Sequence, residues 1–364
     1  MPRPTPTLWP LEPHSRIKHE ILRQYINAWL PIMTRGSQRV VIVDGFAGPG
    51  EYSGGEPGSP LIMLNSCLGH RDNPSSRSEV VFQFIEERPD RASHLQQLIN
   101  RLGEMPKHVK VDVVSGRYEA HFSRLLDGLM GTGEGLAPTF AFIDPFGYSQ
   151  ASMTLTGKFL QFRRCEVLVY MPLPFVSRFV DLNGQEPAMD SLFGCEDWRA
   201  ARRVRGEARR NCLRDLFEKQ LRASGSEFVE RFEIETRGGG GYYLFFGTTH
   251  LKGVERMRAV LWKMDPLQGS RYKESNDEGQ SAGLPLRPST APLLDLLHSA
   301  FVGRMFTIQD AEAVILRDTS YRFSVGHLRP ELKRAEDAGR LQVVGRSGRR
   351  KGTYPDGTAM RLST

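Results

Sequence analysis

The stretch from Val41 to Gly50 constrains the fold of this chain more than any other. Three β-branched residues precede Asp44, and glycines follow at positions 45, 48 and 50. A short, continuous apolar run is typical of a buried parallel strand, and glycine lets the backbone pass close to a ligand because it has no Cβ. We therefore expect a strand that feeds a ligand-binding loop. The spacing does not fit the GxGxxG fingerprint, which argues against a dinucleotide. The alternative is a strand-to-loop turn without a ligand.

Apolar runs and helical periodicity alternate along the first half of the chain. An amphipathic helix over residues 14–33 comes first, because apolar side chains recur there every three or four residues. A later helix opens with Ser59 as its N-cap and Pro60 at its first position. We expect strands at 39–45, 80–85, 109–114, 139–143 and 166–171, and helices over 91–102 and 119–129. This alternation predicts βαβ units and an α/β fold whose parallel sheet carries helices on both faces.

The second half of the chain continues this pattern and then changes character. We expect a helical stretch over 198–223, a hairpin of 228–236 and 242–248, and a helix over 254–264. Residues 266–288 are polar and rich in Gly, Ser and Pro, as is typical of a linker. Helices over 292–301, 308–316 and 324–338 then precede strands at 341–345 and 358–362, which is winged-helix order. The predicted domains are therefore 1–265 and 289–364, joined by a linker over 266–288.

Composition restricts the class of protein. Hydrophobic residues make up 39% of the 364 residues, which is enough for a core, and no apolar run reaches the ~18 residues of a membrane span. Residues 1–6 lack the apolar stretch of a signal peptide, so we expect a cytoplasmic protein. The four cysteines form no CxxC pair, which indicates neither a metal site nor a disulfide framework. The net charge of +7 permits a polyanionic partner.

Acidic side chains close two of the expected strands. Asp44 ends the first strand and Glu86 the second, and the carboxyl ends of parallel strands form the edge where open α/β sheets bind ligands. A carboxylate after the second strand can accept both hydroxyls of a ribose, and Glu87 competes for this role by register. Tyr118 follows the third strand and offers a ring to a planar ligand. The alternatives are a solvated strand end and an ordinary turn.

The segment Asp144-Pro145-Phe146-Gly147 closes the fourth strand. Asp144 and the carbonyl of Pro145 can accept hydrogen bonds from an exocyclic amino group, and Phe146 can stack on a planar substrate. The alternative is a turn in which the proline and the glycine serve geometry alone.

Basic side chains gather in two stretches that suit contact with phosphates. The helical stretch after residue 198 contributes Arg202, Arg205 and Arg209. The expected recognition helix and wing contribute Arg329, Lys333, Arg346, Arg349, Arg350 and Lys351. The alternatives are a solvated helix face and, for the winged helix, a role in protein docking.

Together these motifs resemble class I S-adenosylmethionine methyltransferases. Asp44-x-Phe46-x-Gly48-x-Gly50 is similar to their first cofactor motif. Asp144-Pro145-Phe146-Gly147 is similar to their DPPY-type motif and to that of tRNA guanine-N2 methyltransferases. The order of motifs over roughly residues 10–340 resembles the three-Cys-motif partner proteins (TcmP). The segments that carry this resemblance are His14–Lys18, Val43–Gly50, Gly58–Leu61, Phe84–Glu86, Phe142–Gly147, Phe193-Gly194 with Trp198, Tyr242–Phe246 and Gly253–Pro266.

This resemblance implies a Rossmann-like methyltransferase sheet that ends in an antiparallel strand pair, with S-adenosyl-L-methionine as cofactor. It also implies a bacterial source and a protein partner with a three-cysteine, radical-SAM-like motif. Lys18 would reach a substrate phosphate or the cofactor carboxylate. Asp144, Pro145 and Phe146 would present the substrate. The cofactor would be bound by Asp44, Phe46, Gly48, Gly50, Glu86 and Tyr118.

Three functions remain open at this point. The first is methylation of an amino nitrogen of a nucleic-acid base, in RNA or DNA. The second is a non-catalytic, methyltransferase-like scaffold or regulator that binds nucleic acid and a protein partner through its winged helix. The third is methylation of a small molecule or peptide, against which the basic charge argues mildly.

Overall fold

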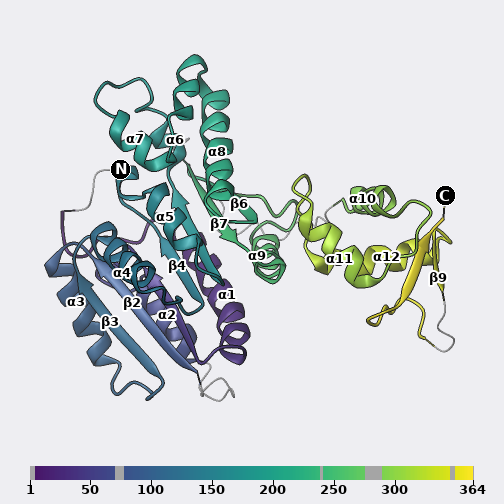
Figure 1. Ribbon diagram of the computed structural model, residues 1–364, viewed down its shortest axis with the longest axis horizontal. Helices are drawn as coiled ribbons and strands as arrows, with labels where there is room; N and C mark the ends of the chain where they lie inside the picture. The colour runs from purple at the N-terminus through teal and green to yellow at the C-terminus, as the bar shows by residue number, and fades with distance from the viewer. Residues whose placement is uncertain (1–4, 70–77, 238–240, 275–288, 345–348, 364) are drawn as a thin grey trace. The chain divides into compact units, whose positions relative to one another are not determined.

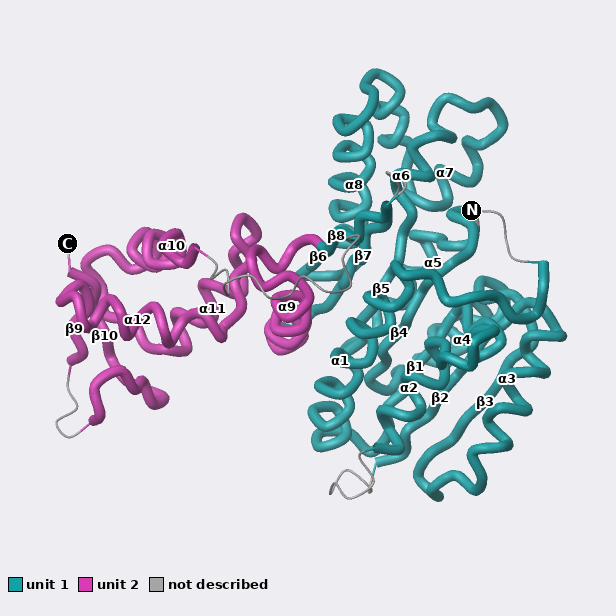
Figure 2. Tube along the Cα trace, turned by 180° about the vertical axis from the view of Figure 1, so that it is seen from behind, with its two compact units in different colours: residues 1–250, 272–275 teal, residues 251–271, 276–364 magenta. Residues whose placement is uncertain are grey.

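The chain divides into two compact units. The computed structural model describes residues 5–69, 78–237, 241–274, 289–344 and 349–363 (Figure 1). The first unit consists of residues 1–250 and 272–275, and the second consists of residues 251–271 and 276–364 (Figure 2). Each unit has its own apolar core.

A mixed sheet of eight strands forms the centre of the first unit, in the order β3-β2-β1-β4-β5-β7-β6-β8. Neighbours among β1 to β5 are parallel, whereas β7 runs antiparallel to both β5 and β6. The predicted parallel strands and the predicted hairpin are therefore confirmed. The strands are Arg39–Asp44 (β1), Glu79–Glu86 (β2), Val109–Ser115 (β3), Thr139–Ile143 (β4), Cys165–Met171 (β5), Phe228–Glu235 (β6), Gly241–Thr248 (β7) and Arg271–Lys273 (β8).

Helices connect these strands and cover the sheet. The helices of the first unit are α1 (Pro13–Arg35), α2 (Ser59–Leu68), α3 (Pro89–Arg101), α4 (Tyr118–Thr132), α5 (Met153–Leu160), α6 (Leu173–Val176), α7 (Glu186–Phe193) and α8 (Gly206–Ala223), with the 3-10 helices η2 (Tyr148–Gln150) and η3 (Asp197–Arg203). The sequence did not predict α5, α6 or α7. They have eight, four and eight residues, which is too short for a 3.6-residue period to stand out.

Apolar side chains alternate between the two faces of the sheet and fill a core on each. On one face, Tyr25 and Trp29 of α1 pack against Phe140 of β4. On the other face, Phe122 of α4 contacts Phe159 of α5 within a large apolar cluster. Because both faces are buried, β1, β2, β4 and β5 read as near-continuous apolar runs, as expected for a parallel sheet.

The second unit is mostly helical. Its elements are α9 (Leu251–Met264), α10 (Ala291–Phe301), α11 (Ile308–Arg317), η4 (Val325–His327), α12 (Leu328–Asp337), β9 (Leu341–Val344) and β10 (Ala359–Leu362). The two strands form an antiparallel hairpin, and Phe306 bridges to Met360 of β10. The core of this unit joins Leu293 and Leu297 of α10 with Ile315 of α11.

The first unit ends earlier than the predicted boundary at residue 265, because α9 packs into the second unit. The buried Arg258 of α9 donates to the carbonyl oxygens of Ile315 and Asp318, both at 2.7 Å. Trp262 Nε1 donates to the carbonyl oxygen of Arg322 at 3.0 Å. Strand β8 lies inside the predicted linker over 266–288 and adds to the edge of the sheet. Residues 275–288 of that linker lie outside the described residues.

Two local helix predictions are corrected. The helical stretch over 198–223 is interrupted at Val204 and Arg205, which are extended, and α8 begins at Gly206 with a φ of 58°. The N-cap of α2 is Gly58, so Ser59 is the first helical residue, and no side chain caps this end. Among the described residues, no helix is both long and apolar enough to cross a membrane.

Candidate active site at the carboxyl edge of the sheet

Strand register brings several polar residues onto one face of the sheet. Asp44 of β1 pairs with Phe142 of β4, which in turn pairs with Leu168 of β5. Side chains at paired positions point to the same face, and so do those two residues further along a strand. Asp144 follows Phe142 by two residues and Tyr170 follows Leu168 by two. The register therefore assigns Asp44, Asp144 and Tyr170 to the face that α1 covers.

A cavity opens at this edge and collects most of the predicted site residues. It contains about 970 Å³ of space between atoms, with the open solvent at its mouth included. Of the predicted residues it is lined by Phe46, Gly48, Gly50, Asp144, Pro145 and Phe146. Its other walls come from the N-terminal segment, α1 and the ends of two further strands, and include Trp9, His14, Lys18, Tyr52, Tyr170 and Tyr242.

The loop after β1 requires its glycines for two different reasons. Gly48 and Gly50 have positive φ angles of 63° and 89°, which L side chains rarely adopt. Gly50 also lacks room, because a Cβ would lie 2.6 Å from Leu95 Cδ1. At Gly45 a Cβ would lie 2.7 Å from the ring of Tyr118. Gly45 was not among the predicted site residues, although the packing of Tyr118 depends on it.

Glu86 is buried at the end of β2, where it holds the loop after β1 through the backbone. Its Oε2 accepts a hydrogen bond from the Gly48 amide at 3.0 Å, and its Oε1 accepts one from the Arg88 amide at 2.8 Å. Glu86 therefore holds the loop after β1 in place.

Tyr118 and Glu86 line a second, narrower pocket that shares Phe46 with the main cavity. The Tyr118 ring stacks on Phe122 with centroids 5.2 Å apart, and its other side meets the backbone of Gly45. Both ring faces are thus covered, which corrects the expectation that Tyr118 stacks on a ligand. Its buried hydroxyl has no hydrogen-bond partner among the described residues.

Asp44 is fully buried beneath the loop. Its Oδ1 accepts a hydrogen bond from the Phe46 amide at 3.1 Å. Its Oδ2 is buried and makes no hydrogen bond of ordinary geometry within the described residues. Burial raises the pKa of Asp44 to about 7, because desolvation disfavours a carboxylate. A cationic ligand group would supply the partner that this carboxylate lacks.

Asp144 forms an ion pair with Lys18, which α1 delivers to the end of β4. The Lys18 side chain is 8% exposed and that of Asp144 is 22% exposed. Burial opposes the charge of Lys18, but the carboxylate of Asp144 more than offsets it, so the pKa of Lys18 lies above its ordinary value. The ammonium also lies 4.5 Å from the centroid of the Tyr170 ring.

Aromatic rings line the cavity beside this ion pair. Tyr170 stacks on Tyr242 with centroids 4.7 Å apart and an interplanar angle of 17°, and Tyr242 stacks on His14 at 4.6 Å and 19°. Burial and the nearby charge of Lys18 lower the pKa of His14 to about 4 and that of His19 to about 3. Both imidazoles are therefore neutral at pH 7.

The N-terminal arm, residues 5–12, forms part of the cavity wall. The ring centroid of Trp9 lies 5.6 Å from that of Phe146 and 5.8 Å from that of Tyr52. The guanidinium of Arg91 lies 4.5 Å from the Trp9 ring and 5.5 Å from the Phe146 ring. The Ser53 amide donates to the carbonyl oxygen of Trp9 at 2.9 Å. Trp9 thus connects the loop after β1 with the loop after β4.

The start of α3 anchors this arm. Arg88 Nη1 donates to the carbonyl oxygen of Thr5 at 2.6 Å, and Arg91 Nη2 donates to that of Pro6 at 3.0 Å. The hydroxyl of Thr7 donates to Asp90 at 2.6 Å. These contacts explain why a proline-rich segment has a defined path next to the site.

The predicted phosphate contacts of α8 are engaged within the protein. Arg209 is 7% exposed and donates to Asp181 at 2.9 Å and to the carbonyl oxygen of Ala201 at 3.0 Å. Arg202 donates to Glu186 at 2.8 Å. Arg205 lies 3.5 Å from Asp181. Arg209 is therefore a structural residue that holds the start of α8, which corrects its predicted role.

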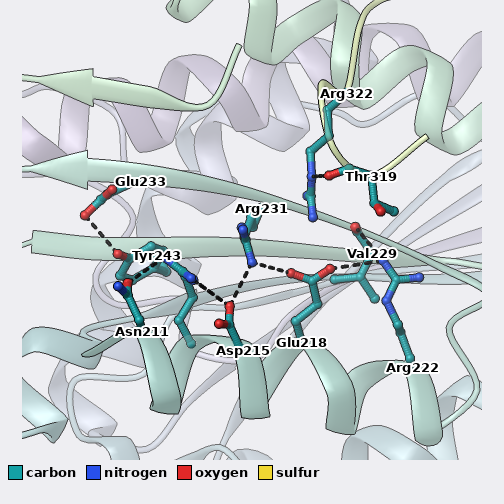
Figure 3. Close-up of polar contacts among 11 residues, drawn as sticks. Asn211, Asp215, Glu218, Arg222, Val229, Arg231, Glu233, Tyr243, Thr319 and Arg322 are labelled. Carbon is teal, nitrogen blue, oxygen red and sulfur yellow. Dashed lines mark hydrogen bonds and ion pairs between the residues drawn. The ribbon is translucent and has the colours of Figure 1, made fainter. Parts of the chain in front are cut away.

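Acidic residues of the same helix also bind basic partners (Figure 3). Arg231 of β6 donates to Asp215 at 3.1 Å and to Glu218 at 2.8 Å, and Arg222 donates to Glu218 at 3.0 Å. These pairs attach α8 to the antiparallel end of the sheet. These ion pairs therefore neutralise part of the basic charge around α8, the helix that was predicted to contact phosphates.

The basic residues of the second unit fall into two groups. Arg349 pairs with Glu336, Arg329 donates to the carbonyl oxygen of Tyr354 at 2.7 Å, and Lys351 lies 3.0 Å from Asp337. The exposed side chains of Lys333 and Arg350 have no hydrogen-bond or ion-pair partner among the described residues. Arg346, also predicted in the wing, lies outside the described residues.

Several residues of this site were not predicted from sequence. Trp9 is a single aromatic residue in a proline-rich segment, and Arg91 reads as one charge of an amphipathic helix. Tyr170 closes the apolar run of β5, so its place at the carboxyl edge could have been inferred from strand parity. Within the described residues, no group of His, Cys, Asp and Glu side chains is arranged to hold a metal ion.

The strand order, with its antiparallel β7 next to β5, defines a class I methyltransferase fold. No family model matches the chain, and no curated protein matches it. Among solved structures, the chain is similar to an O-methyltransferase from Bacillus cereus in complex with SAH, with 12% identity, a TM-score of 0.36, and coverage of 65% of this chain and 82% of that one.

Trm1 from Pyrococcus horikoshii, solved with S-adenosyl-L-methionine, matches at 11% identity and a TM-score of 0.34, over 70% of this chain and 61% of that one. TomG, an O-methyltransferase from Streptomyces achromogenes solved with SAM, matches at 14% identity and a TM-score of 0.34, over 62% of this chain and 79% of that one. The chain spans 40% of a protein described as a methyltransferase from Porphyromonas gingivalis.

Proposed function

We propose that this protein is an S-adenosylmethionine-dependent methyltransferase that modifies an amino nitrogen of a nucleic-acid base. One observation carries the proposal: Asp144 and Phe146 share a single cavity with the glycine loop after β1. A methyl donor on that loop and an amine at Asp144 would then be neighbours. Much of the catalysis would come from holding the two reactants in line, away from water.

The residues present suit this cofactor. Asp44 is a buried carboxylate behind the loop after β1, where its charge would favour an ammonium group of a methionyl moiety. Gly48 and Gly50 leave the backbone accessible, and Glu86 in the second pocket offers carboxylate oxygens to a ribose. When bound, the cofactor supplies a methyl group activated by its sulfonium. Phe46 contributes to both pockets and would lie between the two halves of the ligand.

The acceptor would bind at the end of β4. Asp144 and the carbonyl of Pro145 accept the hydrogens of the amine and direct the nitrogen lone pair at the methyl carbon, while the ring of Phe146 packs on the base. The bound cofactor would supply the methyl group to the amine, and the remainder of the cofactor would leave as a thioether. The ammonium product then passes a proton to Asp144 or to water, and no strong base is required.

The second unit supports a role in binding nucleic acid. Its helices α10, α11 and α12, followed by a two-stranded hairpin, fit a winged-helix domain, in which Lys333 and Arg350 present exposed cations. Phosphate contacts of this kind would add affinity without reading sequence. The order of motifs further suggests membership of the three-Cys-motif partner family. Co-purification with a cysteine-rich protein encoded nearby tests that association.

Isothermal titration with S-adenosylmethionine tests the cofactor assignment. We expect binding to the wild-type protein and weaker binding to Asp44→Asn, because the amide cannot pair with an ammonium. Gly55→Ala serves as a control, since this glycine lies in a nearby turn with nothing within 4 Å of its Cβ position. A folded wild-type protein that binds no cofactor at millimolar concentration would remove the proposal.

Transfer of a labelled methyl group onto total RNA or total DNA tests the reaction. The label should appear in one of them and should be lost in Asp144→Ala, and mass spectrometry of the nucleosides should identify the modified base. Label found in protein alone would redirect the proposal to a peptide substrate.

A non-catalytic scaffold is the second candidate, and one feature favours it. Three charged groups of the site already have partners within the chain, since Lys18 pairs with Asp144 and Glu86 accepts from two amides. This candidate predicts that Asp144→Ala leaves the biological activity intact, whereas substitutions of Lys333 and Arg350 abolish it. The methyltransferase proposal predicts that Asp144→Ala abolishes it.

A further inference from the structure

We infer that Lys18 is a second residue for recognising the acceptor, and that Lys18 and Asp144 together read one edge of the base. Asp144 accepts the hydrogens of the amino group. Lys18 donates to a ring nitrogen or carbonyl oxygen on the same edge of the base. This inference rests on the proposed function and deepens it, because it names the hydrogen-bond pattern that the substrate must present.

The geometry of the pair supports this role. Lys18 and Asp144 come from elements that are 126 residues apart in the chain, and they meet inside the main cavity rather than beside it. Asp144 Oδ2 receives the ammonium, and no described residue donates to Oδ1. An ammonium has three hydrogens, so one bond to Asp144 leaves it able to donate elsewhere. A ligand can therefore meet a donor and an acceptor side by side.

Lys18 is the only lysine or arginine among the described residues that line the main cavity. The two histidines of the cavity cannot replace it as cations. Burial and the charge of Lys18 lower the pKa of His14 to about 4 and that of His19 to about 3. A cationic donor for the acceptor base must therefore come from Lys18.

The walls around the pair suit a flat ligand. The rings of Tyr170, Tyr242 and His14 are nearly parallel to their neighbours, with interplanar angles of 17° and 19°. Phe146 and Phe46 supply further apolar surface. An uncharged planar ring with a donor and an acceptor on one edge would satisfy this site without leaving either charge unpaired.

Nucleobases with an amino group meet this requirement. Adenine, cytosine and guanine each carry an unprotonated ring nitrogen next to the amine, which is N1 in adenine and N3 in cytosine and guanine. An aromatic amine that lacks such an acceptor would leave a hydrogen of Lys18 unsatisfied inside the cavity. Loss of one hydrogen bond to a charged group should reduce kcat/KM by about ten- to a hundredfold.

The first arm of the test uses the wild-type protein and oligonucleotides that contain the base labelled in the transfer assay. Each parent base is compared with an analogue that keeps the amine and loses the neighbouring ring nitrogen: 1-deazaadenine, 3-deazacytosine or 3-deazaguanine. We expect kcat/KM for the analogue to be lower by about ten- to a hundredfold. Equal rates for both would overturn the inference. Absence of labelling with any nucleic acid would instead contradict the proposed function.

The second arm uses Lys18→Met, with Arg16→Met as a matched control because Arg16 is an exposed cation on the same helix. Lys18→Met should transfer methyl groups to the parent base and to the analogue at equal, low rates, and Arg16→Met should behave like the wild type. Lys18→Arg should restore part of the discrimination. Lys18→Met that still prefers the parent base would show that the pair serves stability alone, and so would overturn the inference.

Titration of S-adenosylmethionine into Lys18→Met separates the acceptor from the cofactor. We expect the Kd to stay within about threefold of the wild-type value, which is well under the tenfold that ~1.4 kcal/mol represents. A larger loss of cofactor affinity would place Lys18 in the cofactor site and contradict its role toward the base. The comparison of bases in the wild-type protein still decides the inference if Lys18→Met does not fold.

Discussion

At the scale of single residues, the loop after β1 shows two separate reasons why a position requires glycine: a positive φ angle and a lack of space for a Cβ. Gly50 has a φ of 89°, and a Cβ there would meet Leu95 at 2.6 Å. Gly55 has a φ of 83°, and nothing lies within 4 Å of its Cβ position. The two residues thus share a backbone conformation and differ only in the space around them.

Gly50→Ala should therefore destabilise the protein more than Gly55→Ala does. Both variants force an alanine into the left-handed region, at a cost of about 1 kcal/mol, but Gly50→Ala adds overpacking of about 1–3 kcal/mol. Urea unfolding of the two variants measures the difference. Equal losses of stability would mean that Leu95 moves aside without cost.

Asp44 gives the stability of the protein a specific dependence on pH. Its folded pKa of about 7 lies above the ordinary value of 3.8, so between these values the folded state holds a proton that the unfolded chain has released. Stability from this group is therefore present below about pH 4 and is lost as the pH rises through 7. The loss is at most about 4 kcal/mol, since each pKa unit corresponds to ~1.4 kcal/mol.

Asp44→Asn should remove this part of the pH dependence. Its urea midpoint should change less than that of the wild type between pH 5 and pH 8, and at pH 8 the variant should be the more stable of the two. An unchanged slope in the variant would assign the pH dependence to other groups.

The sequence predicted where several single residues lie, but it did not predict the contacts between them. Gly48, Gly50, Asp144 and Phe146 could be placed at the cavity, because they follow apolar runs that mark strand ends. Asp44 was predicted beside them and lies buried behind the loop instead. The pairing of Asp144 with Lys18 could not be predicted, because it depends on how α1 lies across the sheet.

At the scale of elements, the strands were predictable and the short connections were not. Strands that are buried on both faces appear in the sequence as continuous apolar runs. The bounds of β4 agree with the predicted strand over 139–143. The sequence between β4 and β5 and that between β5 and α8 are broken into short helices, which are too short to show a helical period. The assignment of α9 failed for another reason, since an amphipathic pattern does not say which of two cores the apolar stripe joins.

The N-terminal arm is the element whose role at the site can be tested most directly. Trp9→Ala should weaken binding of S-adenosylmethionine by about ten- to a hundredfold, because a ligand in the cavity would lose apolar contact with this half-buried ring, and burying a large apolar side chain contributes about 1.5–3 kcal/mol. Trp9→Phe should retain most of the affinity, since a ring still meets Phe146 and Tyr52. Titration calorimetry measures both. Full affinity in Trp9→Ala would show that the arm is not a wall of the cofactor site.

At the scale of the whole molecule, the basic residues behind the net charge of +7 differ in whether they are engaged in ion pairs or exposed to solvent. Arg209 and Arg349 are engaged in ion pairs, whereas Lys333 and Arg350 are exposed and have no described partner. Counting basic residues in the sequence therefore overstated the surface available to a polyanion. Only the structure separates the cations that hold the fold from those that can meet a ligand.

Lys333→Ala and Arg350→Ala should each weaken nucleic-acid binding without loss of stability. Each should also reduce the slope of log K against log salt by about one, as expected when one phosphate contact is lost. Arg349→Ala is the contrasting variant, because it should lower the melting temperature by removing the partner of Glu336. Binding isotherms at several salt concentrations provide the test, and an unchanged slope in both lysine and arginine variants would move the interface elsewhere.

The position of Trp9 has a practical consequence for work in solution. The chain has four tryptophans, and Trp29, Trp198 and Trp262 are enclosed in the two cores, with 2%, 0% and 8% of their surface exposed. Only Trp9 lines the mouth of the cavity. A change in indole fluorescence on addition of a small molecule would therefore come from Trp9. Intrinsic tryptophan fluorescence can thus be used to follow ligand binding in the cavity without a label.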